Sequence, residues 1–179
     1  SDVISAYTSY MTSKSEFPGD TFYTGEKTRW GTGEAKFTNV DLLNSEGKKT
    51  DSFVTGDEIT VRLKHKAHKK IDSPVFWVGI INVDGVKVFG SYYNKERVGN
   101  YFIKGKGTLN CTIDSCLFRP GNYYVMVGIY GELGDIAIDR IGRACTFTIR
   151  DEKVKDFEKL YGYGAPGVIN IKHKWVRDI

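Results

Sequence analysis

The sequence predicts an all-β fold, an antiparallel β-sandwich of the immunoglobulin-like or jelly-roll type with a short N-terminal helix or arm. Three observations support this prediction. From residue 34 onward, short runs alternate apolar and polar residues with the period of two that half-buried strands require. Turn signals rich in Gly, Asn and Asp separate these runs. No helical segments alternate with them, so a sandwich is favoured over a fold of βαβ units.

Residues 1–28 have a different pattern from the rest of the chain. A stripe at close to helical spacing consists of Val3, Tyr7, Tyr10 and Met11. Asp2 is placed to cap the start of such a helix, and the segment that follows is rich in Ser, Thr, Gly and charge. We therefore predict a helix and a linker over residues 1–28, and one sandwich domain over residues 29–179.

The first two predicted strands lie between residues 34 and 68. Ala35 and Phe37, then Val40 and Leu42, form two alternating pairs offset by one extra residue, which predicts a bulged strand. In the run EITVRLKHKA that follows, the residues expected to face the core are Ile59, Val61, Leu63, His65 and Ala67. Those expected to face outward are Thr60, Arg62, Lys64 and Lys66.

The run FWVGIINVDG, from Phe76 to Gly85, poses the main question about function. Alternation sends Phe76, Val78 and Ile80 to one face of a strand, and Trp77, Gly79, Ile81 and Val83 to the other. The first face is an ordinary core face. The second is either another buried face or a flat platform open to a ligand. VDG and the run VKVFG then predict a hairpin.

Three later runs complete the predicted sheets: GTLNCTI, NYYVMVGIY and ACTFTIR. The turn RPGN, at residues 119–122, introduces the second of these. The predicted core consists of Phe37, Ile59, Val61, Leu63, Phe76, Val78, Ile80, Val125, Val127 and Phe147.

The C-terminal part predicts a short helix followed by a strand on a hinge. DEKVKDFEKL, residues 151–160, places Val154, Phe157 and Leu160 on one helical face. Residues 161–179 begin with the Gly- and Tyr-rich hinge YGYGAPG and continue into the amphipathic run VINIKHKW. A terminal strand on a hinge is a candidate for exchange between two protomers.

Composition narrows the function classes. The net charge of +4 is mild for a nucleic-acid-binding protein, and we expect no nucleic-acid partner. No apolar run approaches the ~18 residues that a membrane-spanning helix needs. The three cysteines show no CxxC spacing, so we expect neither a disulfide framework nor a zinc site, and we expect Cys145 to be a small buried apolar residue.

We find no catalytic or metal-binding motif. The three histidines form no metal-ligand cluster, and no cofactor is expected. Glu132, Asp135 and Asp139 lie close together in GELGDIAIDR, but the segment resembles a solvated loop rather than a carboxylate pair facing a cleft. We therefore expect a protein that is not an enzyme.

The aromatic content of 13% points instead to ligand binding. In a sandwich, the strands that contain Trp77, NYYVMVGIY and TFTIR commonly lie together in one sheet. The outer face of that sheet would hold Trp77, Tyr124 and Tyr130, with a floor opened at Gly79 and Gly128. Flat rings together with hydroxyl and guanidinium donors suit a sugar. The predicted ligand-binding residues are Trp77, Tyr124, Tyr130 and Arg150, with Tyr92 and Tyr93 as the next choice.

A family resemblance extends this interpretation. RWGTGEAKFTNVDLL, FVTGDEITVRLKHKA, SPVFWVGIINVDGVKVFG and the closing GVINIKHKW resemble the C-terminal domain of Wzt proteins, over about residues 29–175. Wzt is the nucleotide-binding subunit of bacterial ABC transporters that export O-antigen polysaccharide. DVISAYTSYM resembles the tail that leaves the ATPase domain, but this sequence contains no Walker A, signature or Walker B motif, so ATP hydrolysis is not carried over.

The resemblance implies a non-catalytic carbohydrate-binding β-sandwich at the cytoplasmic face of the bacterial inner membrane. Such a domain would recognise the finished, capped, non-reducing end of a surface polysaccharide and select it for export. Its implied partners are the polysaccharide, the rest of the ABC transporter and a second copy, joined by exchange of the C-terminal strand. The alternative is a structural dimerisation module whose aromatic face is buried by its partner.

Overall fold

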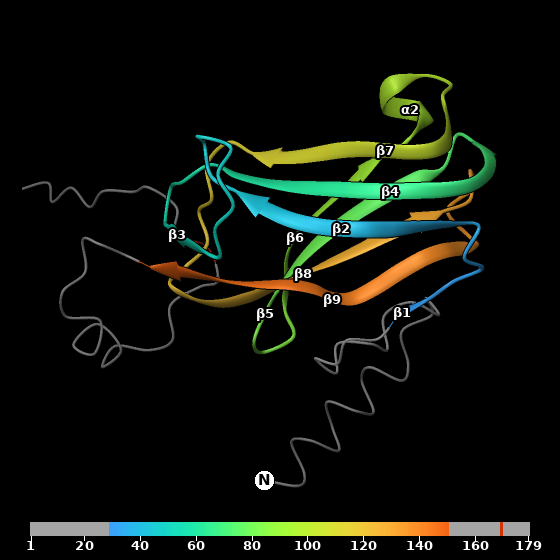
Figure 1. Cartoon of the computed structure of the whole chain (residues 1–179). Coiled ribbons are helices and arrows are strands. Elements are labelled where there is room, and N and C mark those ends of the chain that lie inside the picture. The colour runs from blue at the N-terminus through green and yellow to red at the C-terminus, as the bar shows by residue number, and fades with distance from the viewer. Residues whose placement is uncertain (1–28, 151–168, 170–179) are drawn as a thin grey trace, which may run out of the picture.

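The computed structural model describes residues 29–150 and residue 169, which form two β-sheets packed face to face (Figure 1). The larger sheet has the order β1-β9-β8-β5-β6, with β3 paired alongside β9, and the smaller sheet has the order β2-β4-β7. All pairings are antiparallel except that of β3 with β9. The β-sandwich predicted from the sequence is confirmed.

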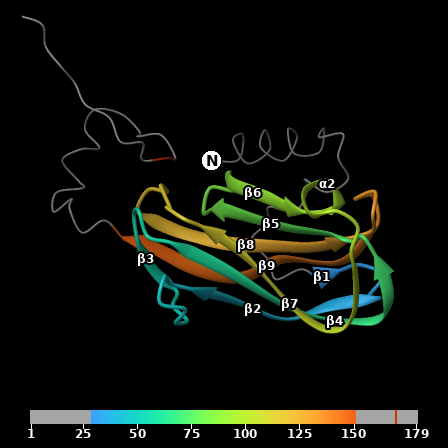
Figure 2. The same ribbon diagram turned by 90° about the horizontal axis from the view of Figure 1, so that it is seen from above.

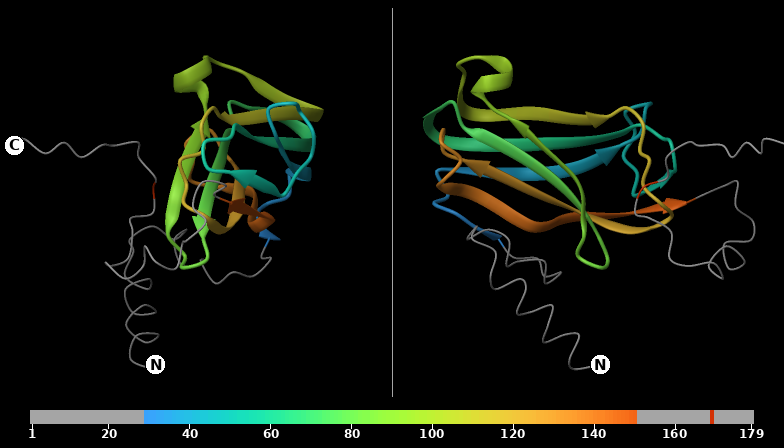
Figure 3. Two further views of the ribbon diagram at one scale, coloured as in Figure 1. Left: turned by 90° about the vertical axis from the view of Figure 1, so that its left-hand side faces the viewer. Right: turned by 180° about the vertical axis from the view of Figure 1, so that it is seen from behind.

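The larger sheet consists of β1 (Arg29–Trp30), β3 (Ser52–Val54), β5 (Val75–Asn82), β6 (Lys87–Tyr93), β8 (Gly121–Tyr130) and β9 (Ala137–Arg150). The smaller sheet consists of β2 (Ala35–Leu43), β4 (Ile59–Asp72) and β7 (Phe102–Ile113). A single helical turn, α2 (Lys95–Val98), joins β6 to β7. The strands of the smaller sheet cross those of the larger sheet at an oblique angle (Figure 2). Viewed from behind, the β5–β6 hairpin lies toward the viewer and runs obliquely across the sandwich (Figure 3, right).

The core lies between the two sheets and contains all ten residues predicted for it. Their side chains are between 0% and 4% exposed. Alternation explains this result, because each strand contributes every second residue to the space between the sheets. The inward residues of β4 are also confirmed, and the ring of its His65 packs against Phe76 at a centroid distance of 5.1 Å.

The structure contains two local features that the sequence predicts, a bulge and a hairpin. The predicted bulge in β2 is present, as a register shift against β4 between Phe37 and Asn39. The β5–β6 hairpin turns at Asn82, whose side-chain Oδ1 accepts a hydrogen bond from the Val86 backbone N–H at 2.8 Å.

The interpretation of GELGDIAIDR as a solvated loop is wrong for Asp139. This residue lies within β9 and is 2% exposed. Its carboxylate accepts two hydrogen bonds from Arg29, each at 2.8 Å, and one from the Phe37 backbone N–H at 2.7 Å. A buried carboxylate needs such partners, and here they join β1 and β2 to the start of β9.

Several predictions fall outside the described residues. These are the helix and linker over residues 1–28, the helix over residues 151–160 and most of the hinge and terminal strand over residues 161–179. Of that last segment only Ile169 is described, and it forms an isolated antiparallel bridge with Phe118.

Candidate functional site

A line of directly paired residues crosses the outer face of the larger sheet. In order from β1 to β6, its members are Trp30, Arg140, Gly128, Trp77 and Tyr92. Residues directly opposite one another in antiparallel strands point to the same face. The register therefore brings two indoles, a guanidinium and a phenol onto one line. The prediction that the Trp77, NYYVMVGIY and TFTIR strands share a sheet is confirmed.

The expectation that Trp77 forms an open platform is wrong. Its side chain faces outward from the core, as predicted, but it is only 6% exposed and forms a second apolar cluster with Ile81, Tyr124 and Met126. The indole lies over Gly79, where an added Cβ would stand 2.5 Å from its Cζ2 atom. The missing side chain at Gly79 therefore accommodates the Trp77 ring and does not open a floor for a ligand.

Cationic side chains flank the same indole. The guanidinium carbon of Arg140 lies 5.5 Å from the Trp77 ring centroid and 4.8 Å from that of Trp30. On the β6 side, the Lys87 Nζ atom lies 5.8 Å from the Trp77 ring centroid. Cations at such distances are attracted by the ring quadrupole. They occupy positions that a stacked sugar would need.

Tyr130 fills the second predicted opening. An added Cβ at Gly128 would stand 2.4 Å from the Tyr130 Cε2 atom, so this ring also lies over the glycine of its own strand. Burial raises the pKa of the Tyr130 phenol, and the neighbouring Arg140 guanidinium partly offsets that increase. Tyr130 remains half-buried and contributes to the outer cluster rather than to an open floor.

The other four predicted ligand-binding residues do not lie together. Tyr124 is buried on the outer face, and the guanidinium carbon of Arg143 lies 4.8 Å from its ring centroid. Tyr92 and Tyr93 lie at the end of β6. They consequently point to opposite faces: Tyr92 is exposed opposite Trp77, whereas Tyr93 packs against the core. Arg150 is exposed at the end of β9.

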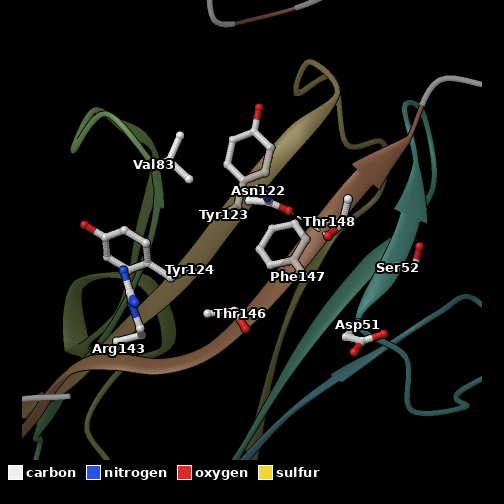
Figure 4. A pocket seen from close by; sticks show the side chains of 10 residues that line it. All are labelled: Asp51, Ser52, Val83, Asn122, Tyr123, Tyr124, Arg143, Thr146, Phe147 and Thr148. Atoms are coloured by element: carbon white, nitrogen blue, oxygen red, sulfur yellow. Dashed lines mark hydrogen bonds between the residues drawn. The ribbon is translucent and has the colours of Figure 1, made fainter. Parts of the chain in front are cut away.

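A polar hollow opens on the outer face beside Tyr124, with a cavity volume of about 370 Å³ (Figure 4). Its lining residues are Asp51, Ser52, Val83, Asn122, Tyr123, Tyr124, Arg143, Thr146, Phe147 and Thr148. Val83 on the β5–β6 turn borders one side, and Asp51 with Ser52 borders the other. Of the six predicted residues, only Tyr124 lines this hollow.

The polar groups of the hollow come from neighbouring strands in register. Asn122 of β8 lies opposite Thr148 of β9, and the Thr148 hydroxyl donates a hydrogen bond to Asn122 Oδ1 at 2.8 Å. Thr146 lies opposite Tyr124 on the same two strands. A guanidinium, a carboxylate, an amide and several hydroxyls thus surround one space. Donors and acceptors of this kind can bind the hydroxyl rim of a sugar or an acidic substituent on it.

A second hollow, of about 380 Å³, adjoins the first because both include Asp51 and Thr146 in their lining. It is also lined by Asp41, whose Oδ1 lies 2.7 Å from Lys49 Nζ. Together the two hollows extend the polar surface from β8 across β9 to the edge of β2. A ligand longer than one sugar residue would have contacts along this path.

The sequence contained a partial signal for the hollow. Alternation along TFTIR sends Phe147 and Ile149 to the core and Thr146 and Thr148 to the outer face, and the hollow is lined by both threonines. Arg143 was missed because β9 contains a register shift between the partners of Val125 and Val127, and Arg143 falls within that irregular stretch. Ser52 was missed because it begins a strand of only three residues, β3, and Asp51 was missed because it precedes that strand.

Within residues 29–150, no group of three or more His, Cys, Asp or Glu residues lies close enough to hold a metal ion. The cysteines are free thiols, and burial raises the pKa of Cys145 to about 12 and that of Cys116 to about 11. No helix in the described part of the chain is long and apolar enough to cross a membrane.

A family model for the Wzt C-terminal domain matches residues 26–163. The chain belongs to this family. The family implies a role in the ABC transporter that exports O-antigen, and hence association with the inner membrane. Wzt C-terminal domains are transporter domains that are generally non-catalytic.

One solved structure supports the same fold. The crystal structure of the C-terminal domain of Wzt matches with a TM-score of 0.70 and 19% identity, covering 87% of this chain and 91% of that chain. A Niemann-Pick type C2 protein from the Japanese carpenter ant matches at 14% identity and a TM-score of 0.45, over 70% of this chain and 99% of that one. Parabacteroides merdae β-glucuronidase matches at 16% identity and a TM-score of 0.43, covering 65% of this chain and 14% of that chain. A comparison with curated proteins finds no match.

Proposed function

We propose that this domain is a non-catalytic carbohydrate-binding module that recognises the capped, non-reducing end of an O-antigen or related surface polysaccharide. Recognition would select the finished chain for export by the ABC transporter, at the cytoplasmic face of the inner membrane. The observation that supports this proposal most directly is the polar hollow that Tyr124 and Arg143 help to line.

The size and chemistry of the hollow fit this role. Its volume of about 370 Å³ falls within the ~300–1,000 Å³ range of small-ligand sites. Hydroxyl and amide groups from Ser52, Asn122, Thr146 and Thr148 can exchange hydrogen bonds with sugar hydroxyls. Arg143 adds a planar donor that can bind a carboxylate or phosphate with two parallel hydrogen bonds. A capped chain end offers this combination of groups.

The strands that form the hollow are firmly positioned. Tyr123 and Phe147, directly opposite each other on β8 and β9, stack on the core side with ring centroids 5.5 Å apart. Their neighbours Asn122, Tyr124, Thr146 and Thr148 therefore project outward from a rigid pair of strands. Sites built on such elements hold their polar groups more precisely than sites on loops.

A glycan array of bacterial surface polysaccharides, probed with the 179-residue chain, tests the proposal. We expect binding to a small set of glycans that share one terminal structure, and loss of binding when that terminal residue is removed enzymatically. Equal binding to chains with and without the terminal residue would contradict end recognition. The absence of binding to every glycan would favour the structural dimerisation role.

A further inference from the structure

The outer face of the smaller sheet, on the opposite side of the sandwich from the hollow, carries a row of three lysines. Lys36 of β2 lies directly opposite Lys66 of β4, which in turn lies directly opposite Lys106 of β7. Adjacent strands are about 4.8 Å apart, so three like charges occupy one line across the sheet. All three side chains are exposed.

Further cations surround this row. We call the whole set the basic face; it consists of Lys36, Arg62, Lys64, Lys66, Lys104 and Lys106. Asp41 lies on the same side opposite Arg62, but its carboxylate is engaged by Lys49 at 2.7 Å. Within residues 29–150, none of the five lysines forms an ion pair with a carboxylate, although Lys64 also attracts the Asp41 carboxylate electrostatically.

Such an arrangement is unfavourable in the isolated chain. Like charges directly opposite each other on adjacent strands are destabilising, and none of the three opposed lysines forms an ion pair with a carboxylate in the described part of the chain. A surface of opposite charge would relieve this repulsion. The charge pattern therefore indicates an anionic partner for this face.

The chemistry of the face indicates which anion fits. Five of its six cations are lysines, which act as point charges, whereas recognition of one defined phosphate or carboxylate favours the bidentate geometry of arginine. Neither hollow is lined by a residue of the basic face, and none of its six members is aromatic, so it offers no stacking surface for sugars or bases. An array of exposed lysines that extends across three strands suits an extended anionic surface.

One exposed aromatic residue lies beyond the end of the basic face. Phe102, at the start of β7 and two residues from Lys104, is 58% exposed, and Lys70 Nζ lies 5.0 Å from its ring centroid. Apolar rings beside lysines are typical of segments that rest in the headgroup region of a bilayer.

We propose that the basic face docks on an anionic phospholipid surface, with Phe102 entering the headgroup region. This inference rests on the inner-membrane association that the family implies and is independent of glycan recognition. It orients the sandwich so that the polar hollow, on the opposite sheet, faces away from the lipid. Clusters of four to eight basic residues are sufficient for such attraction to anionic lipids.

Vesicle co-sedimentation of the 179-residue chain tests the proposal. We expect binding to vesicles of phosphatidylethanolamine and phosphatidylglycerol, weakening as salt is raised, and no binding to phosphatidylcholine vesicles. The variant Lys36→Gln/Lys66→Gln/Lys106→Gln should lose at least about tenfold in affinity. Its melting temperature should be equal or higher, because the opposed charges are gone.

The control variant Lys48→Gln/Lys95→Gln/Arg150→Gln removes the same charge from outside the basic face. It should keep most of the vesicle affinity. Equal losses in the two variants would show that net charge alone drives binding and would overturn the proposal. Binding of the wild-type chain to an acidic polysaccharide through the three lysines, without binding to anionic vesicles, would also overturn it.

Discussion

The indole of Trp77 lies over Gly79, two residues along the same strand, so that a methyl group at Gly79 would approach the ring to 2.5 Å. Both residues were expected on the outer face, with the glycine leaving space for a ligand. The glycine leaves space for the tryptophan instead. The outer face of β5 consequently has a packed layer of its own, formed by Trp77, Ile81, Tyr124 and Met126.

Gly79→Ala should destabilise the fold, because the added Cβ displaces a buried indole. Overpacking of this kind typically costs ~1–3 kcal/mol. Gly90→Ala is the matched control: Gly90 lies opposite Gly79 on β6, and its added Cβ would have ordinary contacts of 3.7 Å or more. Urea unfolding of both variants checks the prediction. Equal stabilities would show that the indole moves aside without cost.

Trp77→Ala should reduce the free energy of unfolding by ~3–5 kcal/mol, as expected for a large buried side chain. Tyr92→Ala, directly opposite it on β6, should cost about 1 kcal/mol or less because Tyr92 is 51% exposed. Thermal and urea unfolding give both values. A Trp77→Ala protein that melts like the wild type would restore the open-platform interpretation.

His65 should make stability depend on pH. Burial lowers the pKa of this ring below its ordinary value of 6.5. The unfolded chain then binds the proton more readily than the folded chain below pH 6.5, so stability should fall as pH decreases from 6.5 toward the folded pKa. One group can contribute at most about 1.4 kcal/mol per pH unit.

Urea unfolding of the wild type, His65→Leu and His68→Gln between pH 7.5 and 5 measures this contribution. His68 is exposed, so its variant should keep the wild-type pH dependence. In His65→Leu the decline over this range should be smaller. A His65→Leu protein with the wild-type slope would assign the pH dependence to other groups.

Deletion of residues 161–179 should give a monomer or an insoluble chain if the terminal strand is exchanged between two protomers. The physical reason is that a hinge able to reach either sheet makes the closed and exchanged forms similar in contacts. Light scattering of the full chain and of the deletion variant shows whether each is a monomer or a dimer, and so tests strand exchange. A soluble, stable dimer formed by the deletion variant would rule out exchange as the basis of assembly.

The sequence predicted the core-facing residues correctly wherever apolar and polar residues alternate without interruption. Phe76, Val78 and Ile80 on β5, and Val125 and Val127 on β8, were assigned to the core because each strand keeps a period of two. The start of β9 was not predicted, because Asp139 interrupts the apolar pattern. Its position is set by Arg29, 110 residues away in the sequence, and such a pairing cannot be inferred from local pattern.

For the site, the sequence predicted only the face of the strand on which each side chain lies. Alternation correctly placed Trp77 and Tyr124 on the outer side of the larger sheet, but exposure depends on what else reaches that side. Arg140 reaches Trp77 from a strand separated by one intervening strand, and Arg143 reaches Tyr124 from an irregular stretch of β9. The hollow results from these long-range placements.

Glycan affinity of two arginine variants tests the central claim most directly. Arg143 lines the hollow, whereas Arg150 is exposed at the end of the same strand and does not line it. With the glycan identified on the array as ligand, calorimetric titration of Arg143→Gln should show at least about a tenfold loss of affinity, the usual consequence of removing a charged hydrogen-bond partner. Arg150→Gln should bind within about twofold of the wild type, since surface changes outside a site have small effects. Full affinity in Arg143→Gln together with a large loss in Arg150→Gln would contradict the account and place the glycan at the end of β9.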